Sequence, residues 1–235
     1  MALNFVKATG QYVTIGATAA LQNVAASTIT CWIKATSFGP DGNRNKIISV
    51  STNAASTRFS IAWDSAAKGI GALGKALDGD ALFQWNSNYA LNNAQWYHVA
   101  VRCTFTTGIY SLYVDGVNVA NSAAQGWTKG NTSNTISAAC LIGGNVAGNG
   151  EFFDGIIDDL RVYNIGLTTE QIMTMFVSKG IDNITSGLYH QWRMNEGYEG
   201  LAAAGAARIK DNVGNLNGTP GNNPVYIGSP LKLRK

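Results

Sequence analysis

Aromatic residues that stand among amides and glycines are the first places where this sequence suggests chemistry. Trp127 lies in a glycine-flanked stretch, with Asn131 close behind it. Trp85 opens an asparagine-rich stretch that ends at Tyr89. An exposed ring can stack on a sugar while neighbouring amides hydrogen-bond its hydroxyl groups. Both stretches are candidate ligand-binding sites, and packing in the core is the alternative for each ring, since large aromatic side chains are mostly buried.

The acidic residues argue against hydrolysis. A glycosidase needs two carboxyl groups on either side of the scissile bond. The glutamates all fall in predicted turns, at a helix start or in the tail: Glu151, Glu170, Glu196 and Glu199. Asp158 and Asp159 are consecutive on a predicted strand, so they should face opposite sides. We therefore expect no enzymatic activity and no catalytic residues.

The histidines and the glycine-rich stretch do not change that expectation. His98 and His190 have no serine or cysteine motif beside them, so structural roles are expected. Residues 69–75 nearly form a phosphate-binding loop. Ala76 stands where that loop needs Ser or Thr, and no helix follows, so the glycines are read as part of a strand and turn.

Calcium is the metal that the loop residues could hold, because it prefers oxygen ligands. Three groups are available: Asp154 alone, Asp41 with Asn43 and Asn45, and Asp78 with Asp80. No stretch holds three acids at ligand spacing. Solvated loops are the simpler explanation, so the metal ligands stay unknown and no cofactor is required.

Composition and charge exclude several classes. The 235 residues are 46% hydrophobic and 13% charged, with a net charge of +3, which describes a folded chain without a basic face. Nucleic acid is therefore not an expected partner. No apolar run approaches the roughly 20 residues of a membrane span, and the start lacks signal-peptide features, so synthesis in a cytoplasm is expected. The three cysteines, Cys31, Cys103 and Cys140, have no metal-like spacing and should be buried free thiols.

Most of the chain up to about residue 166 alternates apolar and polar residues in short runs, which is strand spacing. The predicted strands are Leu3–Val6, Tyr12–Ile15, Thr28–Lys34, Lys46–Ser51, Arg58–Asp64, Ala81–Trp85, Trp96–Thr104, Tyr110–Asp115, Val117–Ala120, Ala138–Gly143 and Gly155–Tyr163. Asp115-Gly116 predicts a tight hairpin. Many strands with short connections predict two packed antiparallel sheets.

One helix is predicted against this background. Thr168 and Gln171 form a capping-box pattern, and Gly180 stands where a left-handed C-cap belongs. The helix should run from about Thr169 to Lys179. Its apolar residues, Ile172, Met175 and Phe176, should cover one edge of the sandwich.

Several ordered motifs resemble concanavalin A-like, laminin G-type jelly rolls. They are Ala2-Leu3-Asn4-Phe5, Ser27 to Lys34, Gln95 to Ala100, Tyr110 to Gly116 and Phe153 to Asn164. The resemblance covers residues 2 to about 180 and implies an all-β, two-sheet antiparallel jelly roll. Val6-Lys7 replaces the Asp-Gly usual in that family, which weakens the transfer of any metal site. The Glu-x-Asp-x-x-Glu pattern of related sandwich glycosidases is absent.

The tail is similar to a segment that normally comes first in that family. Residues 188–197 and 210–219 carry this likeness, yet here they come last. We therefore expect one domain over 1–235, with main strands in 1–166, the helix in 168–180, and closing strands in a loop-rich tail at 186–235. Either these strands close their own sandwich, which is favoured, or they pair with a neighbouring subunit.

Two functions remain open. The first is a non-catalytic, surface-displayed phage virion component, such as a capsid decoration or fibre protein, with other virion proteins as partners and the virion surface as its final location. It rests on the missing signal peptide, reduced cysteines, low charge and lack of a catalytic set. The alternative is a lectin-like module that binds cell-surface polysaccharide, with calcium as an optional aid. A homo-oligomer is expected for the virion protein.

Overall fold

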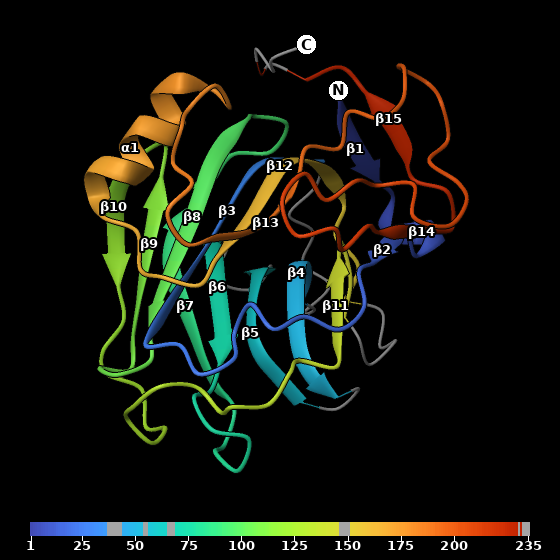
Figure 1. The fold of residues 1–235 in the computed structure, drawn as a ribbon. Helices are drawn as coiled ribbons and strands as arrows, with labels where there is room; N and C mark the ends of the chain where they lie inside the picture. The colour runs from blue at the N-terminus through green and yellow to red at the C-terminus, as the bar shows by residue number, and fades with distance from the viewer. Residues whose placement is uncertain (37–43, 54–55, 65–68, 146–150, 230, 232–235) are drawn as a thin grey trace.

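The protein is a sandwich of two strand layers with one helix on its outer side (Figure 1). The structure is a computed structural model that describes residues 1–36, 44–53, 56–64, 69–145, 151–229 and 231. The all-β expectation is confirmed. A short 3₁₀ turn, η1 (Lys7–Thr9), and one α-helix are the helical elements of the described part.

One layer, called sheet A, has eight strands among the described residues, in the order β10-β9-β8-β3-β12-β1-β15, with β13 also paired to β12. Its strands are β1 (Ala2–Phe5), β3 (Ala26–Ala35), β8 (Tyr97–Thr104), β9 (Ile109–Val114), β10 (Val117–Asn121), β12 (Gly155–Tyr163), β13 (Leu188–Trp192) and β15 (Val225–Ile227). The predicted hairpin between β9 and β10 is present, with Asp115 and Gly116 at φ 49° and 82°.

The other layer, called sheet B, has seven described strands in the order β14-β2-β11-β4-β5-β6-β7. They are β2 (Tyr12–Thr14), β4 (Arg44–Asn53), β5 (Ser56–Asp64), β6 (Gly69–Gly74), β7 (Phe83–Ala90), β11 (Ala139–Ile142) and β14 (Thr219–Gly221). The glycine-rich stretch is thus a strand, β6, with every residue buried. The described residues that follow it, 75–82, form no helix that could bind phosphate.

The core lies between the inner faces of the two sheets. In β3 the inward residues are Ile29, Cys31 and Ile33, as the alternation predicted, and all are at most 1% exposed. The three cysteines are free and buried, as expected. Burial in apolar surroundings raises the pKa of Cys140 to about 12, so it stays a protonated thiol.

The helix α1 (Thr169–Ser178) begins at the predicted capping box, formed by Thr168 and Gln171. It lies over the outer face of sheet A, near the edge strand β10 (Figure 1). The expectation that it covers an edge is therefore only partly right. Its buried residues Ile172 and Met175 pack with Tyr113 and Tyr163 on the outer face of the sheet. That face is apolar where the helix covers it.

An aromatic group holds the end of this helix on the sheet. Phe176 stacks on Trp32 at 5.8 Å between ring centroids, and the ring of His98 lies 5.4 Å from that of Trp32. Burial, reinforced by the charge of Arg161, lowers the pKa of His98 to about 4. His98 is therefore a neutral packing residue at ordinary pH.

The C-terminal strands close the same chain's sandwich. Strand β15 pairs with β1, with Ala2 opposite Ile227, and β14 pairs with β2. Strand β13 pairs with the second half of β12, while β1 pairs with the first half. The favoured intramolecular arrangement is the one found in this structure, and residues 188–227 are integral to both layers.

Candidate functional site

Trp127 does not offer an exposed ring. It is 2% exposed and packs in the core beside Phe105 and Tyr110, and its indole N–H donates to the Phe105 carbonyl at 2.9 Å. The glycine-flanked loop folds inward because this hydrogen bond satisfies the one polar atom of the ring. Trp127 is therefore a core residue, as the alternative interpretation had it. Asn131 lies at the surface, where the buried ring of Trp127 offers it no stacking surface.

The second predicted pair lies on the edge strand β7. Trp85 faces the core and stacks on Tyr110 at 6.0 Å, whereas Tyr89 is 39% exposed. Asn86 lies opposite Gly71, on the outer side of the sheet. The structure therefore brings together only Tyr89 and nearby amides, and their role in binding stays a prediction.

A different aromatic pair has the geometry of a binding surface. Tyr12 of β2 and Phe152 are both partly exposed, and their rings lie at an interplanar angle of 22°, with centroids 6.2 Å apart. We call this pair the Tyr12–Phe152 platform. Tyr12 faces outward from sheet B because its neighbour Val13 points into the core. Phe152 likewise precedes a core residue, Phe153.

Glycines form the floor beneath the platform. A Cβ on Gly221 of β14 would lie 2.5 Å from Cζ of Tyr12. A Cβ on Gly10 or Gly144 would lie 3.2 Å from ring atoms of Phe152. Because these three residues have no side chains, the rings can lie close to the backbone of other segments. The backbone at these glycines therefore lies against the two rings.

Polar groups border the platform. The Asn145 side-chain amide donates to Oε2 of Glu151 at 2.7 Å. The same carboxylate oxygen lies 3.7 Å from Nζ of Lys46, and the Glu151 side chain is 25% exposed. Asn145 follows Gly144 and Glu151 precedes Phe152, so an amide and a carboxylate belong to residues next in sequence to the floor and to the platform. This combination of ring faces and hydrogen-bonding groups suits a sugar.

Lys7 hydrogen-bonds to two of the predicted calcium ligands, Asn45 and Asp154. The ammonium of Lys7 donates to Oδ1 of Asn45 at 3.0 Å, and its backbone N–H donates to Oδ1 of Asp154 at 3.2 Å. Burial lowers the pKa of Lys7, while the charge of Asp154 opposes that shift. A positive charge at these oxygens disfavours a second cation there.

The other calcium candidates are engaged in loop contacts. Asp78 pairs with Arg58 at 2.6 Å, and Asp80 accepts from the backbone of Leu77 at 2.8 Å. Asp41 and Asn43 lie outside the described residues. Within the described residues, no group of three or more His, Cys, Asp or Glu side chains is placed to hold a metal ion.

His190 takes part in a hydrogen-bond chain with Thr18 and Asp211. Its Nδ1 lies 2.6 Å from Oδ2 of Asp211 and its Nε2 lies 2.7 Å from Oγ1 of Thr18. Burial alone would raise the pKa of Asp211, but hydrogen bonds from His190 and from backbone N–H groups lower it to about 2. The ionised carboxylate can only accept, so Nδ1 of His190 donates to it.

The hydrogen-bond chain Thr18–His190–Asp211 has the arrangement of a hydrolase triad, but a substrate could not reach it. Thr18 is 5% exposed and His190 is 3% exposed. The imidazole also stacks on Trp192, with ring centroids 5.1 Å apart. A nucleophile in this position meets no substrate, so the three residues fasten the C-terminal segment to the loop before β3.

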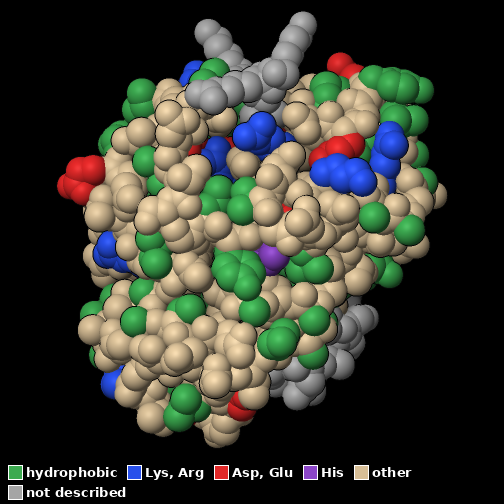
Figure 2. Space-filling model, viewed as in Figure 1, with side chains coloured by type: hydrophobic (Ala, Val, Ile, Leu, Met, Phe, Trp, Pro, Cys, Tyr) green, Lys and Arg blue, Asp and Glu red, His purple; other side chains and the backbone are tan. Residues whose placement is uncertain are grey.

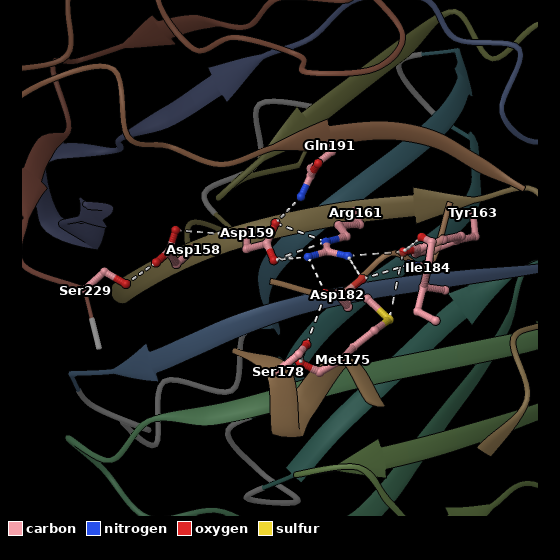
Figure 3. Close-up of polar contacts among 10 residues, drawn as sticks. All are labelled: Asp158, Asp159, Arg161, Tyr163, Met175, Ser178, Asp182, Ile184, Gln191 and Ser229. Atoms are coloured by element: carbon pink, nitrogen blue, oxygen red, sulfur yellow. Dashed lines mark hydrogen bonds and ion pairs between the residues drawn. The ribbon is translucent and has the colours of Figure 1, made fainter. Parts of the chain in front are cut away.

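A second buried polar network lies on the outer face of sheet A (Figure 3). Arg161 pairs with Asp159 at 2.6 Å and with Asp182 at 2.7 Å, and Gln191 donates to Asp159 at 2.6 Å. These contacts bind β12, β13 and the segment after α1 to one another. Every charged group in the centre of the network has a partner within it.

The network overturns one prediction from the sequence. Asp158 and Asp159 were expected on opposite sides of a regular strand. A bulge in β12 shifts the register between Asp158 and Arg161, and Asp159 has φ 41°. Both carboxylates therefore lie on the outer face, where Ser229 donates to Asp158. Burial raises the pKa of Asp158 well above its usual range.

On the face drawn in Figure 2, basic and acidic side chains are mixed in the upper part, and large areas carry no charge. None of the helices in the described part of the chain has the length and apolarity needed to cross a bilayer.

Sequence reasoning missed the Tyr12–Phe152 platform. Tyr12 lies in a stretch that was used only to place a strand, and Phe152 directly precedes the motif that begins at Phe153. The available signal was the set of glycines at positions 10, 144 and 221, but these are distant in sequence. Only the pairing of β14 with β2 brings Gly221 under Tyr12.

The comparisons with known proteins agree with this fold. The family model described as the concanavalin A-like lectin/glucanases superfamily, Laminin_G_3, matches residues 7–173. A search of curated proteins found no match.

Three solved structures are similar in fold. A putative carbohydrate binding protein from Bacteroides ovatus has a TM-score of 0.66 and 22% identity, over 97% of this chain and 61% of its own. The heptameric SAP-like pentraxin from Limulus polyphemus has a TM-score of 0.57 and 18% identity, over 77% and 83% of the two chains. The CBM40 of a Ruminococcus gnavus sialidase, bound to sialyllactose, has a TM-score of 0.54 and 15% identity, over 75% and 96%.

Proposed function

This chain belongs to the concanavalin A-like lectin/glucanases superfamily, and on that premise we propose that it is a non-catalytic carbohydrate-binding module. The observation that carries the proposal is the Tyr12–Phe152 platform, two partly exposed rings on a glycine floor. A sugar ring stacks on the platform, and Glu151 and Asn145 hydrogen-bond its hydroxyl groups.

Two structures of similar fold support a binding role. The Bacteroides ovatus protein is described as a putative carbohydrate binding protein, and the Ruminococcus gnavus module is bound to sialyllactose. This chain spans 61% of the length of the first. At these identities the likeness concerns the fold, so the sugar itself is left to experiment.

The contacts of the carboxylates support binding without hydrolysis. Glycoside hydrolysis requires one acid that gives up a proton and a second that attacks or activates water. Glu151 is held by Asn145 and Lys46, and Asp154 accepts from the Lys7 backbone. Both carboxylates are engaged as hydrogen-bond acceptors.

Calcium is not needed for this binding. Lys7 contributes a positive charge beside Asn45 and Asp154, where a loop site would place a cation. Binding is therefore expected to survive a chelator.

The virion-surface protein is the second candidate, and it rests on the sequence alone. The comparisons favour carbohydrate binding over it. Co-sedimentation of the purified protein with capsids, together with a symmetric oligomer in light scattering, would support the virion role.

The test measures retardation in gels that contain laminarin, galactomannan or xylan, together with a glycan array that includes sialyllactose. We expect Tyr12→Ala and Phe152→Ala each to weaken binding about tenfold, because each removes a stacking contact of about 1.5 kcal/mol. Tyr198→Ala is the matched control, since this ring is 70% exposed elsewhere. Addition of EDTA should change nothing.

Two results would overturn the proposal. One is that no polysaccharide or array glycan binds the folded protein. The other is that both platform variants bind as the unaltered protein does. A parallel Tyr89→Ala variant decides whether the edge strand β7 contributes instead.

A further inference from the structure

Two side-chain amides join the beginning and the end of the chain beside the platform. The side-chain amide of Asn222 donates to the carbonyl groups of Thr9 and Gly10 at 3.1 and 2.8 Å. In return, Gln11 donates to the carbonyl groups of Asn222 and Asn223 at 3.0 and 3.2 Å. We call these four hydrogen bonds the Gln11–Asn222 clamp.

The clamp fixes the two glycines that support different rings. Gly10 accepts a hydrogen bond from Asn222 and lies against Phe152, since a Cβ on Gly10 would lie 3.2 Å from Cε2 of Phe152. Gly221 directly precedes Asn222 and lies under Tyr12. The relative position of the two rings therefore depends on how the 3₁₀ turn η1 and strand β14 are held together.

The backbone at the clamp also favours a fixed geometry. Asn222 has φ 57° and Asn223 has φ 51°, two consecutive left-handed residues between β14 and β15. Asparagine tolerates this conformation better than most residues. Gln11 is 7% exposed, and its Oε1 accepts from the Val6 N–H at 2.7 Å, so its amide cannot rotate freely.

We propose that Gln11 and Asn222 are positioning residues of the binding site. By holding Gly10 and Gly221 at a fixed separation, they keep Tyr12 and Phe152 near-parallel for a sugar ring. This inference rests on the proposed carbohydrate-binding function. It makes the C-terminal segment part of the site, although the matched family segment ends at residue 173.

A positioning role can be separated from a merely structural one. Asn222 is exposed, so water can replace its amide at the carbonyl groups and the loss costs little stability. Glycine accepts the left-handed backbone, so Asn222→Gly removes the amide without strain. Asn215→Gly is the matched control, because Asn215 is also exposed in the C-terminal segment, with φ 60°.

The experiment combines affinity with a direct view of the rings. In gels that contain laminarin, galactomannan or xylan, Asn222→Gly should weaken binding about tenfold, with the thermal midpoint nearly unchanged, and Asn215→Gly should bind normally. In ¹H–¹³C spectra, the ring resonances of Tyr12 and Phe152 should shift in Asn222→Gly, while those of the core residue Phe59 stay in place.

The outcomes separate the two proposals. Normal affinity and unshifted rings in Asn222→Gly, with lost affinity in Tyr12→Ala, would overturn the clamp and keep the binding function. If no polysaccharide binds, the binding function fails, and the ring resonances still decide whether the clamp positions the pair. A thermal midpoint that falls together with affinity, with no ring shift, would show a structural role alone.

Discussion

The buried network on sheet A and the rim around the Tyr12–Phe152 platform use the same residue types in opposite ways. In the network, Arg161 lies between Asp159 and Asp182 and is 3% exposed. At the rim, Glu151 likewise meets a basic side chain, that of Lys46, but the Glu151 side chain is 25% exposed. Both join segments that are far apart in the sequence.

The difference is in what remains available to a ligand. The carboxylates of Asp159 and Asp182 are occupied by Arg161, Gln191 and backbone groups, and the helix α1 packs nearby (Figure 3). At the rim, Tyr12, Phe152 and the Glu151 side chain are partly exposed. A polar cluster therefore indicates binding when it keeps unused hydrogen-bonding capacity, and indicates structure when it does not.

The sharpest way to test the structural side of this comparison is Arg161→Met. Removal of the cation leaves two buried carboxylates without a compensating positive charge, which should cost about 3–5 kcal/mol of unfolding free energy. Urea denaturation measures the loss, and the folded fraction should still bind polysaccharide. Arg208→Met, at a partly exposed site, should cost less than about 1 kcal/mol. A loss for Arg161→Met as small as that control would mean that the network does not stabilise the fold.

The next prediction concerns His98, which lies beside that network. Its pKa is about 4 in the folded protein against 6.5 in its unperturbed state, so the unfolded chain binds the proton first as the pH falls. Stability should be full above pH 6.5 and decrease by roughly 3 kcal/mol towards pH 4. His98→Phe should remove this part of the slope, as urea midpoints across that pH range would show. An unchanged slope would contradict the assignment.

The smallest expected effect concerns the open side of the comparison. Gly221→Ala places a methyl group against the Tyr12 ring, and the ring must move. Stability should change by only about 1 kcal/mol, since the ring is partly exposed and can tilt outward, while affinity for polysaccharide should fall several-fold. Gly79→Ala is the control, because nothing lies within 4 Å of its Cβ position. Equal affinity in the two variants would mean that the floor does not set the platform.

Local patterns were enough to predict most of the architecture. The alternation in Thr28–Lys34, the hairpin at Asp115-Gly116 and the capping box at Thr168 each depend on neighbouring residues, and all three are confirmed. The bulge at Asp159 was not predictable in this way. It depends on Arg161, Asp182 and Gln191, which meet only after the sheet and helix have packed.

The candidate site was harder to predict than the fold. Trp127 has the sequence surroundings of an exposed ring, yet a hydrogen bond to Phe105 and core packing bury it. Tyr12 has the surroundings of an ordinary strand residue, yet a glycine from β14 supports its ring. Whether an aromatic ring is exposed, and what lies against it, depends on segments that are distant in the sequence. A single sequence does not show which segments these are.

The pairing of Ala2 with Ile227 has a consequence for folding kinetics. These two residues are 225 positions apart in the sequence. Strand β1 has a partner on both edges only after β15 has paired with it. Proteins dominated by such non-local pairings fold slowly. On the ribosome, β1 and β2 would each wait with an unpaired edge until the last strands emerge, and such edges promote aggregation.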